Sequence, residues 1–357
     1  MSTRPDSESS PTRTPSSPDD LLPAVQAPNA GFLLQLFLIP LMIVSVIVLV
    51  WLLFSWLASA GSEPRELVRD LKKLNNSSWQ KAVSLANQLQ DPQYDALKDD
   101  AALAQELADV LKGELAAAKM DEARLSLRVY LCRILGEFRV ENGLAPLLDA
   151  ALQEKSADEL RVRAAALESI AVLINNRGAE TMRESAPLRK TLRECSQTVS
   201  EGADADGAYA ELRSRAAFAL GVLGGDEART RLAQMLNDAY PNARYNAATG
   251  LARQGDVRCA KVLLEMLDPQ NVETVKGETL ESNKEAKRLS VLVNGLRAAE
   301  MLLLRESSEP APDDLKAVKD AVVRLSETKD AQAVGMVARE VLQNIAPAPK
   351  PLTPAAS

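Results

Sequence analysis

Histidine is absent from all 357 residues of the chain, and only three cysteines and 4% aromatic residues are present. Without histidine there is no Ser-His-Asp triad, no histidine acid–base catalyst and no histidine ligand for zinc or haem. The cysteines Cys132, Cys195 and Cys259 lie 63 and 64 residues apart, so they form no Cys-x-x-Cys motif. No Gly-x-x-x-x-Gly-Lys-Ser/Thr phosphate loop occurs. We therefore expect no metal, no cofactor and no enzymatic activity.

A surplus of positive charge is also missing. Residues 61–357 contain 40 Lys and Arg against 45 Asp and Glu, whereas phosphate backbones are bound by basic surfaces. A local basic cluster does occur at Arg183, Arg189, Lys190 and Arg193, but such clusters are usually solvated helix faces. We therefore expect no nucleic acid among the partners.

Charge of either sign is absent between residues 21 and 62, and residues 31–60 read GFLLQLFLIPLMIVSVIVLVWLLFSWLASA. A helix of about 20 apolar residues crosses the hydrocarbon core of a bilayer, so this segment predicts one transmembrane helix over 31–60. The alternative is a secretory signal peptide, because residues 58–60 have the small-x-small pattern of a cleavage site. An apolar run about twice the usual length, preceded by 30 residues, favours the membrane anchor.

The flanks of this segment predict its orientation. Trp51 and Trp56 lie near its C-terminal end, where interfacial aromatic residues are common. Arg13 is the only basic residue in the twenty positions before the span. The twenty positions after it contain four basic residues: Arg65, Arg69, Lys72 and Lys73. The positive-inside rule therefore places the C-terminal domain in the cytoplasm, with these four side chains at the membrane interface and within reach of anionic head groups.

Both ends of the chain have the composition of disordered tails. Residues 1–30 are rich in Ser, Thr and Pro, and residues 346–357 are rich in Pro. Such segments bury too little apolar surface to offset the loss of backbone entropy.

Between the anchor and the second tail, apolar residues recur at helical spacing without any alternating strand pattern, which predicts an all-α domain of about a dozen helices. Residues 77–80 (Ser-Ser-Trp-Gln) resemble a helix capping box.

A repeat indicates how these helices are arranged. Four segments align: LRVYLCRILGEF (127–138), VRAAALESIAVL (162–173), LRSRAAFALGVLGGD (212–226) and ARYNAATGLARQGD (243–256). Each has an arginine near its start, then small residues, then an apolar residue seven positions after the arginine. These arginines are Arg128, Arg163, Arg213 and Arg244. The last two segments are 31 residues apart and end in Gly-Asp, which is typical of a helix stop.

The pattern resembles the HEAT repeats, in particular the short PBS-lyase HEAT-like variety with V-R-x-x-A-A-x-A-L-G-x-L-G-D. The resemblance is close at 212–267, fair at 127–173 and weaker at 287–345, with apparent insertions around 174–207 and 268–284. It implies a right-handed α-solenoid of stacked helix pairs over 119–345, of five to seven repeats, preceded by a helical juxtamembrane or capping region at 61–118. In HEAT families the concave face of the solenoid usually binds another protein.

We interpret the four arginines as structural, holding neighbouring repeats in register through carbonyls or carboxylates of the turns. The resulting hypothesis is a single-pass, membrane-anchored HEAT-repeat scaffold that binds a protein partner of unknown identity. An alternative is a lyase-like or chaperone-like protein acting on a tetrapyrrole or on a cofactor-bearing protein, because similar repeats occur in phycobilin lyases. A structural protein with the opposite membrane topology is a third possibility.

Overall fold

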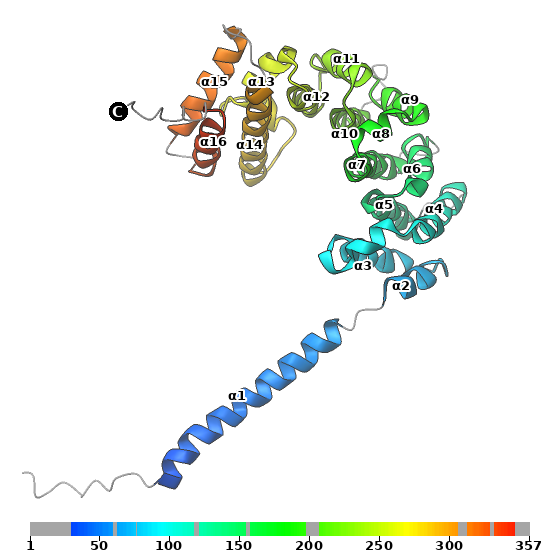
Figure 1. Ribbon diagram of the computed structural model, residues 1–357, viewed down its shortest axis with the longest axis vertical. Helices are drawn as coiled ribbons and strands as arrows, with labels where there is room; N and C mark the ends of the chain where they lie inside the picture. Colours follow the sequence, from blue (N-terminus) through cyan, green and yellow to red (C-terminus); the bar gives the residue numbers. More distant parts are fainter. Residues whose placement is uncertain are drawn as a thin grey trace, which may run out of the picture. The chain divides into compact units, whose positions relative to one another are not determined.

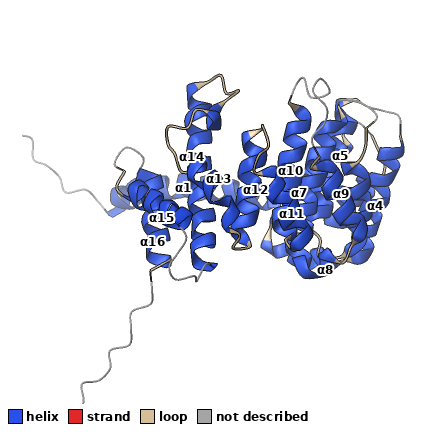
Figure 2. Cartoon of the chain, turned by 90° about the horizontal axis from the view of Figure 1, so that it is seen from above, coloured by secondary structure: helices blue, strands red, loops and turns tan. Residues whose placement is uncertain are grey.

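The computed structural model describes residues 30–59, 63–75, 77–117, 121–154, 158–197, 207–305, 313–328 and 332–346. The chain divides into two compact units, Met1–Ser62 and Glu63–Ser357. Within the described ranges every regular element is a helix and none is a strand (Figure 2). The predicted tails lie outside these ranges, apart from Ala30 and Ala346.

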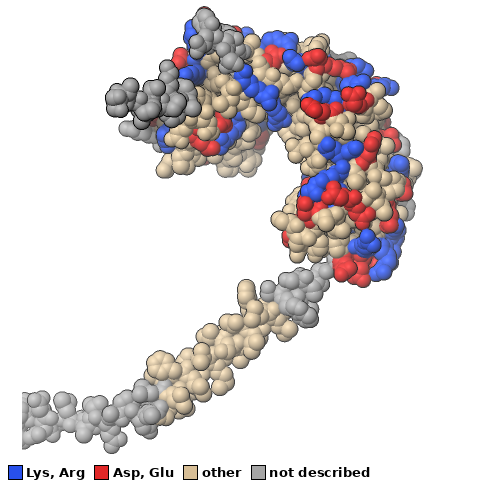
Figure 3. Space-filling view, in the orientation of Figure 1, with Lys and Arg blue, Asp and Glu red and all other residues tan. Residues whose placement is uncertain are grey.

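The first unit contains α1 (Ala30–Ser59), a helix of 30 residues with Pro40 inside it. All its described side chains are exposed, and Figure 3 shows no charged side chain along it. Its segment Leu34–Phe54 has a mean hydropathy of 3.0 and is long and apolar enough to cross a membrane; a signal sequence would meet the same criterion. Trp51 is exposed, whereas the Trp56 side chain is outside the described side chains.

The second unit consists of two layers of helices that follow one another along a curved row (Figure 1). Consecutive inner helices pack side by side: α3 (Ser78–Gln90), α5 (Glu122–Glu137), α7 (Glu159–Arg177), α10 (Ala208–Leu223), α12 (Pro241–Arg253), α14 (Glu281–Arg305) and α16 (Gln332–Asn344). The outer helices are α2 (Pro64–Leu71), α4 (Ala101–Ala116), α6 (Leu144–Ala151), α9 (Ala186–Cys195), α11 (Asp226–Met235), α13 (Ala260–Met266) and α15 (Asp313–Ser326). The described residues thus form seven outer–inner pairs of an α-solenoid.

Short elements lie between these helices. The helix α8 (Ala179–Arg183) links α7 to α9, and the 3₁₀ turns are η2 (Pro92–Asp99), η3 (Glu141–Gly143), η4 (Val257–Cys259) and η5 (Glu273–Val275). The stretch 174–207, which we interpreted as an insertion, contains the outer helix α9 as well as the additional helix α8, so only part of it is extra to the repeat. The two layers already begin at α2, inside the segment predicted as a juxtamembrane or capping region.

Helix ends follow local chemistry that the sequence partly reveals. Asp100 caps α4 by accepting from the amides of Ala102 and Leu103, each at 3.0 Å. The predicted capping box at 77–80 is wrong, because Ser77 has an αR conformation (φ −97°, ψ 0°) and forms no cap. Its amide and hydroxyl instead donate to Oδ1 of Asn75, at 3.0 and 2.8 Å.

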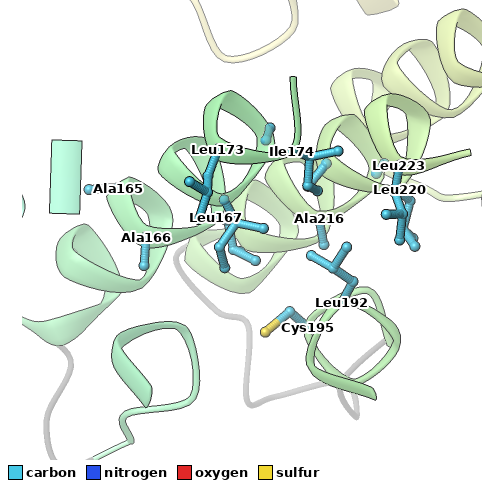
Figure 4. Packing of buried hydrophobic residues seen from close by; sticks show 14 of the residues in the cluster. Ala165, Ala166, Leu167, Leu173, Ile174, Leu192, Cys195, Ala216, Leu220 and Leu223 are labelled. Carbon is cyan, nitrogen blue, oxygen red and sulfur yellow. The ribbon is translucent and has the colours of Figure 1, made fainter. Parts of the chain in front are cut away.

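The core between the layers is built from Leu, Ile, Val and Ala. In Figure 4, Leu173 and Ile174 of α7, Leu192 of α9 and Leu220 of α10 lie in the same buried cluster. Inner helices also approach closely through small residues. A Cβ added to Gly221 of α10 would lie 2.8 Å from the Cα of Gly250 in α12, so these two helices pack backbone against backbone.

Candidate functional site

The four repeat arginines lie on inner helices and reach the ends of outer helices. Arg128 of α5 is fully buried, donates to the carbonyl of Ala117 just after α4 at 3.1 Å, and lies 3.7 Å from Glu159 at the start of α7. Arg163 of α7 donates through Nε to the carbonyl of Ala151, the last residue of α6, at 2.9 Å. Both therefore connect an inner helix to the outer helix before it.

The other two repeat arginines make related contacts. Arg213 of α10 forms a bidentate pair with Asp238 after α11, at 2.9 and 3.1 Å, and both side chains are nearly buried. Arg244 of α12 donates to the carbonyls of Asp238 and Ala239, at 2.9 and 3.2 Å, and pairs with Glu265 of α13. We call the side of the inner helices that carries these four arginines the register face.

The four basic residues after the apolar span are all ion-paired at the surface. The pairs are Arg65–Asp100 at 3.2 Å, Arg69–Glu66 at 3.3 Å, Lys72–Glu106 at 2.7 Å and Lys73–Asp70 at 2.7 Å. The hydrogen bond and charge of Lys73 lower the pKa of Asp70 below its usual value. Contact of these basic side chains with lipid head groups stays a prediction.

A groove runs along the opposite side of the inner helices. One hollow of ≈750 Å³ is formed by α7, α10, α12 and α14, and a second of ≈240 Å³ is formed by α3, α5 and α7. The two hollows share Glu168 and Val172 of α7. We call the two hollows together the inner groove. Sequence reasoning did not identify any of its residues as a site.

The middle of the inner groove is apolar. Val172 is 37% exposed and Phe218 of α10 is 40% exposed, although most apolar side chains on these helices are buried. Polar side chains from the next two inner helices lie beside them, among them Asn246 of α12 and Asn294 of α14. An apolar centre with a polar border is the usual anatomy of a binding surface.

Some arginines of the inner groove have ion-pair partners among the described residues and others do not. Arg215 of α10 is paired with both Glu168 and Glu211, and its Nη2 lies 2.6 Å from Glu211. Arg253 of α12 is half-buried, and within the described ranges it has neither an ion pair nor a hydrogen bond. Burial lowers the pKa of Arg253. The guanidinium of the exposed Arg133 lies 5.1 Å from the ring centre of Tyr130. The groove therefore offers cationic groups on either side of its apolar centre.

A spacing rule could have located this groove in the sequence. A helix turns about 100° per residue, so positions five and nine after a register arginine lie about 140° and 180° around the helix from it. The residues five positions on are Arg133, Glu168, Phe218 and Thr249, and all four line the groove. Glu137, Val172 and Arg253 stand nine positions on and line it as well.

The described part of the chain contains no group of three or more Cys, Asp or Glu residues placed to hold a metal ion. All three cysteines are buried. Burial raises the pKa of the Cys132 thiol to about 12, and burial with the charge of Asp256 does the same for Cys259. These thiols are therefore protonated near neutral pH and poor nucleophiles.

Comparison with known proteins bears on the repeats. Residues 198–283, which include Arg213 and Arg244, match the family model for HEAT repeats. The resemblance seen in the sequence is thereby confirmed for residues 198–283, which are HEAT repeats. No curated protein matches it. Among solved structures, human deoxyhypusine hydroxylase in complex with glycerol is similar at 15% identity and a TM-score of 0.28, over 69% of this chain and 98% of that one.

Proposed function

We propose that this HEAT-repeat chain is a non-enzymatic scaffold, anchored in a membrane by α1, that binds a segment of a partner protein in the inner groove on the cytoplasmic side. The observation that carries the proposal is the exposure of Val172 and Phe218 at the centre of the groove. Leaving two large apolar side chains in water is unfavourable, and a partner that covers them would gain free energy.

The dimensions of the groove favour a polypeptide segment over a small ligand. Its two hollows extend over six inner helices, from α3 to α14. Packed helix axes lie 8–10 Å apart, so the groove is about 45 Å long. An extended chain of about 13 residues covers this distance. The cationic Arg133 and Arg253 on either side of the apolar centre favour a segment with an apolar residue between acidic ones.

The proposed anchor is supported by the length and hydropathy of α1 and by its lack of charge. Four basic residues occur in the twenty positions after the span, whereas only Arg13 occurs in the twenty positions before it. This asymmetry supports the cytoplasmic orientation. Intact mass and N-terminal sequence of the protein from membranes test this part. A chain beginning after Ala60 would identify a cleaved signal peptide and remove the anchor from the proposal.

Co-purification of the full-length protein in detergent tests the groove. Val172→Asp is compared with Val323→Asp on α15, because both valines are 37% exposed and only Val172 lines the groove. A near-stoichiometric partner should be lost with Val172→Asp and retained with Val323→Asp. Retention by both folded variants would contradict the groove as the binding surface. Absorbance of the wild-type protein above 350 nm would instead favour a role with a tetrapyrrole.

A further inference from the structure

A second cavity, independent of the proposed function, lies on another part of the solenoid. It has a volume of ≈570 Å³ and is formed by α8, α9, the end of α10 and α11. Its charged lining residues are Arg183, Arg189, Arg193, Arg231, Asp226 and Glu227. We call it the arginine cavity. The cluster at 183–193, interpreted from the sequence as a solvated helix face, thus contributes three side chains to a cavity wall.

Arg183 is held in a fixed orientation. Its Nε donates to the carbonyl of Leu223 at 2.7 Å, and its side chain lies across the turn formed by Gly224 and Gly225. These glycines have φ of 63° and 86°, and a Cβ on Gly225 would lie 3.1 Å from Cδ of Arg183. A side chain at either glycine would therefore crowd the arginine and displace it by a few tenths of an ångström. In the described ranges, the terminal nitrogens of Arg183 have no hydrogen-bond partner.

The remaining charges leave a positive surplus. Glu227 lies between two arginines, 3.0 Å from Nε of Arg189 and 2.7 Å from Nη1 of Arg193. The Asp226 side chain is 95% exposed and pairs with Arg229, which does not line the cavity. Arg231 donates to the hydroxyl and carbonyl of Ser196 and to Oε1 of Gln234, so it contributes charge to the cavity but few free donors. Arg189 also donates through Nη1 to the carbonyl of Arg183. Four guanidinium groups and two carboxylates therefore line the cavity, and one of these carboxylates, Asp226, pairs with an arginine outside it.

The uncharged part of the lining includes Leu220, Leu223 and Ala228, which are at most 4% exposed, together with the polar Thr230 and Gln234. A ligand that fits has an anionic end for the arginines and a small apolar body, and the volume is that of an ordinary small-molecule site. A carboxylate has two oxygens, and Glu227 shows that one carboxylate satisfies only Arg189 and Arg193. A phosphate ester offers three terminal oxygens and up to two charges, which match three separate arginines.

We propose that the arginine cavity binds a small phosphate monoester, with Arg183, Arg189 and Arg193 on the phosphate and the organic part against the apolar part of the lining. Glu227 competes with the phosphate for two of these arginines. Its neutralisation therefore strengthens binding, whereas loss of a purely structural ion pair would create no ligand affinity.

Calorimetric titration of the full-length protein in neutral detergent and phosphate-free buffer tests the site, with phenyl phosphate and inorganic phosphate as probes. We expect one saturable site per chain, with phenyl phosphate bound about tenfold more tightly, because its ring covers part of the apolar wall. Equal affinity for both probes would contradict the role assigned to that wall, and no saturable heat at millimolar probe would overturn the site.

The matched variants are Arg193→Gln and Lys190→Gln, because both residues lie on α9, both are largely exposed and only Arg193 lines the cavity. Arg193→Gln should weaken phenyl phosphate binding about tenfold or more, and Lys190→Gln less than about twofold. Glu227→Gln should tighten it. Equal weakening by the Arg193 and Lys190 variants would reduce the effect to general charge attraction, and weakening by Glu227→Gln would overturn the proposed competition.

Discussion

The register face and the inner groove lie on the same helices, but residues of the same type are buried and paired on the register face and exposed in the inner groove. On α5, Arg128 is fully buried beside Glu159, whereas Arg133, five residues later, is exposed beside Tyr130. On α10, Arg213 is fixed by Asp238, whereas Phe218 is exposed. The position of a residue around the helix axis, rather than its type, therefore decides whether its side chain stabilises the solenoid or stays available to a partner.

The largest expected difference concerns thiol chemistry. Cys132 is buried on the packed side of α5, and burial raises its pKa to about 12. An exposed thiol with a pKa of about 8.5 contains over a thousandfold more thiolate at pH 8. In a Phe218→Cys variant, the groove thiol should therefore react with a maleimide or disulfide reagent at least about 10³-fold faster than Cys132. Peptide mass spectrometry of the labelled protein measures both rates, and comparable rates would contradict the separation of the two faces.

A large stability difference should separate the two arginines of α5. Arg128→Leu leaves Glu159 buried without its arginine and should lower the free energy of unfolding by about 3–5 kcal/mol. Arg133→Leu should change it by less than about 0.5 kcal/mol, because Arg133 is exposed. Urea denaturation followed by circular dichroism measures both.

A double variant sharpens the assignment of the Arg128 effect. Because the penalty comes from an uncompensated buried charge, Arg128→Leu with Glu159→Leu should recover most of the lost stability. A double variant as unstable as Arg128→Leu alone would show that lost packing or the lost bond to the Ala117 carbonyl dominates.

The next largest change in stability should come from the close approach of α10 and α12. Gly221→Ala forces α10 and α12 apart, because its Cβ would lie 2.8 Å from the Cα of Gly250, and should cost about 1–3 kcal/mol. Gly113→Ala on α4 is the control, because no atom lies within 4 Å of its Cβ position, and it should stabilise by about 0.5–1 kcal/mol. Thermal unfolding of the two variants should shift in opposite directions, and a shift in the same direction would contradict the close packing.

The smallest stability effect should occur in the groove. Val172→Asp should change the midpoint of thermal unfolding as little as Val323→Asp does, because the two valines are equally exposed. A clear loss of stability for Val172→Asp alone would mean that Val172 belongs to the packed core and not to the surface offered to a partner.

Local chemistry explains which details the sequence predicts and which it misses. The end of α10 was predicted from Gly224 and Gly225, because the positive φ at a helix stop favours glycine. The capping box at 77–80 failed because Asn75 competes for the same serine. Part of the stretch 174–207 forms the outer helix α9, which the arginine pattern does not reveal because the repeat arginines lie on inner helices.

The sequence by itself determined the uncharged apolar helix α1, the all-α second unit and the HEAT repeats with their arginines. Those features depend on composition and on spacing within one or two helices. Only the tertiary structure decided that Val172 and Phe218 stay exposed, that Arg253 lacks a partner in the described ranges, and that Arg183, Arg193 and Arg231 border one cavity. The physical reason is that burial and pairing depend on neighbouring helices, and the groups that meet Arg183 and Arg193 lie 40 and 34 residues away along the chain. Local spacing specifies only the position of a residue around its own helix.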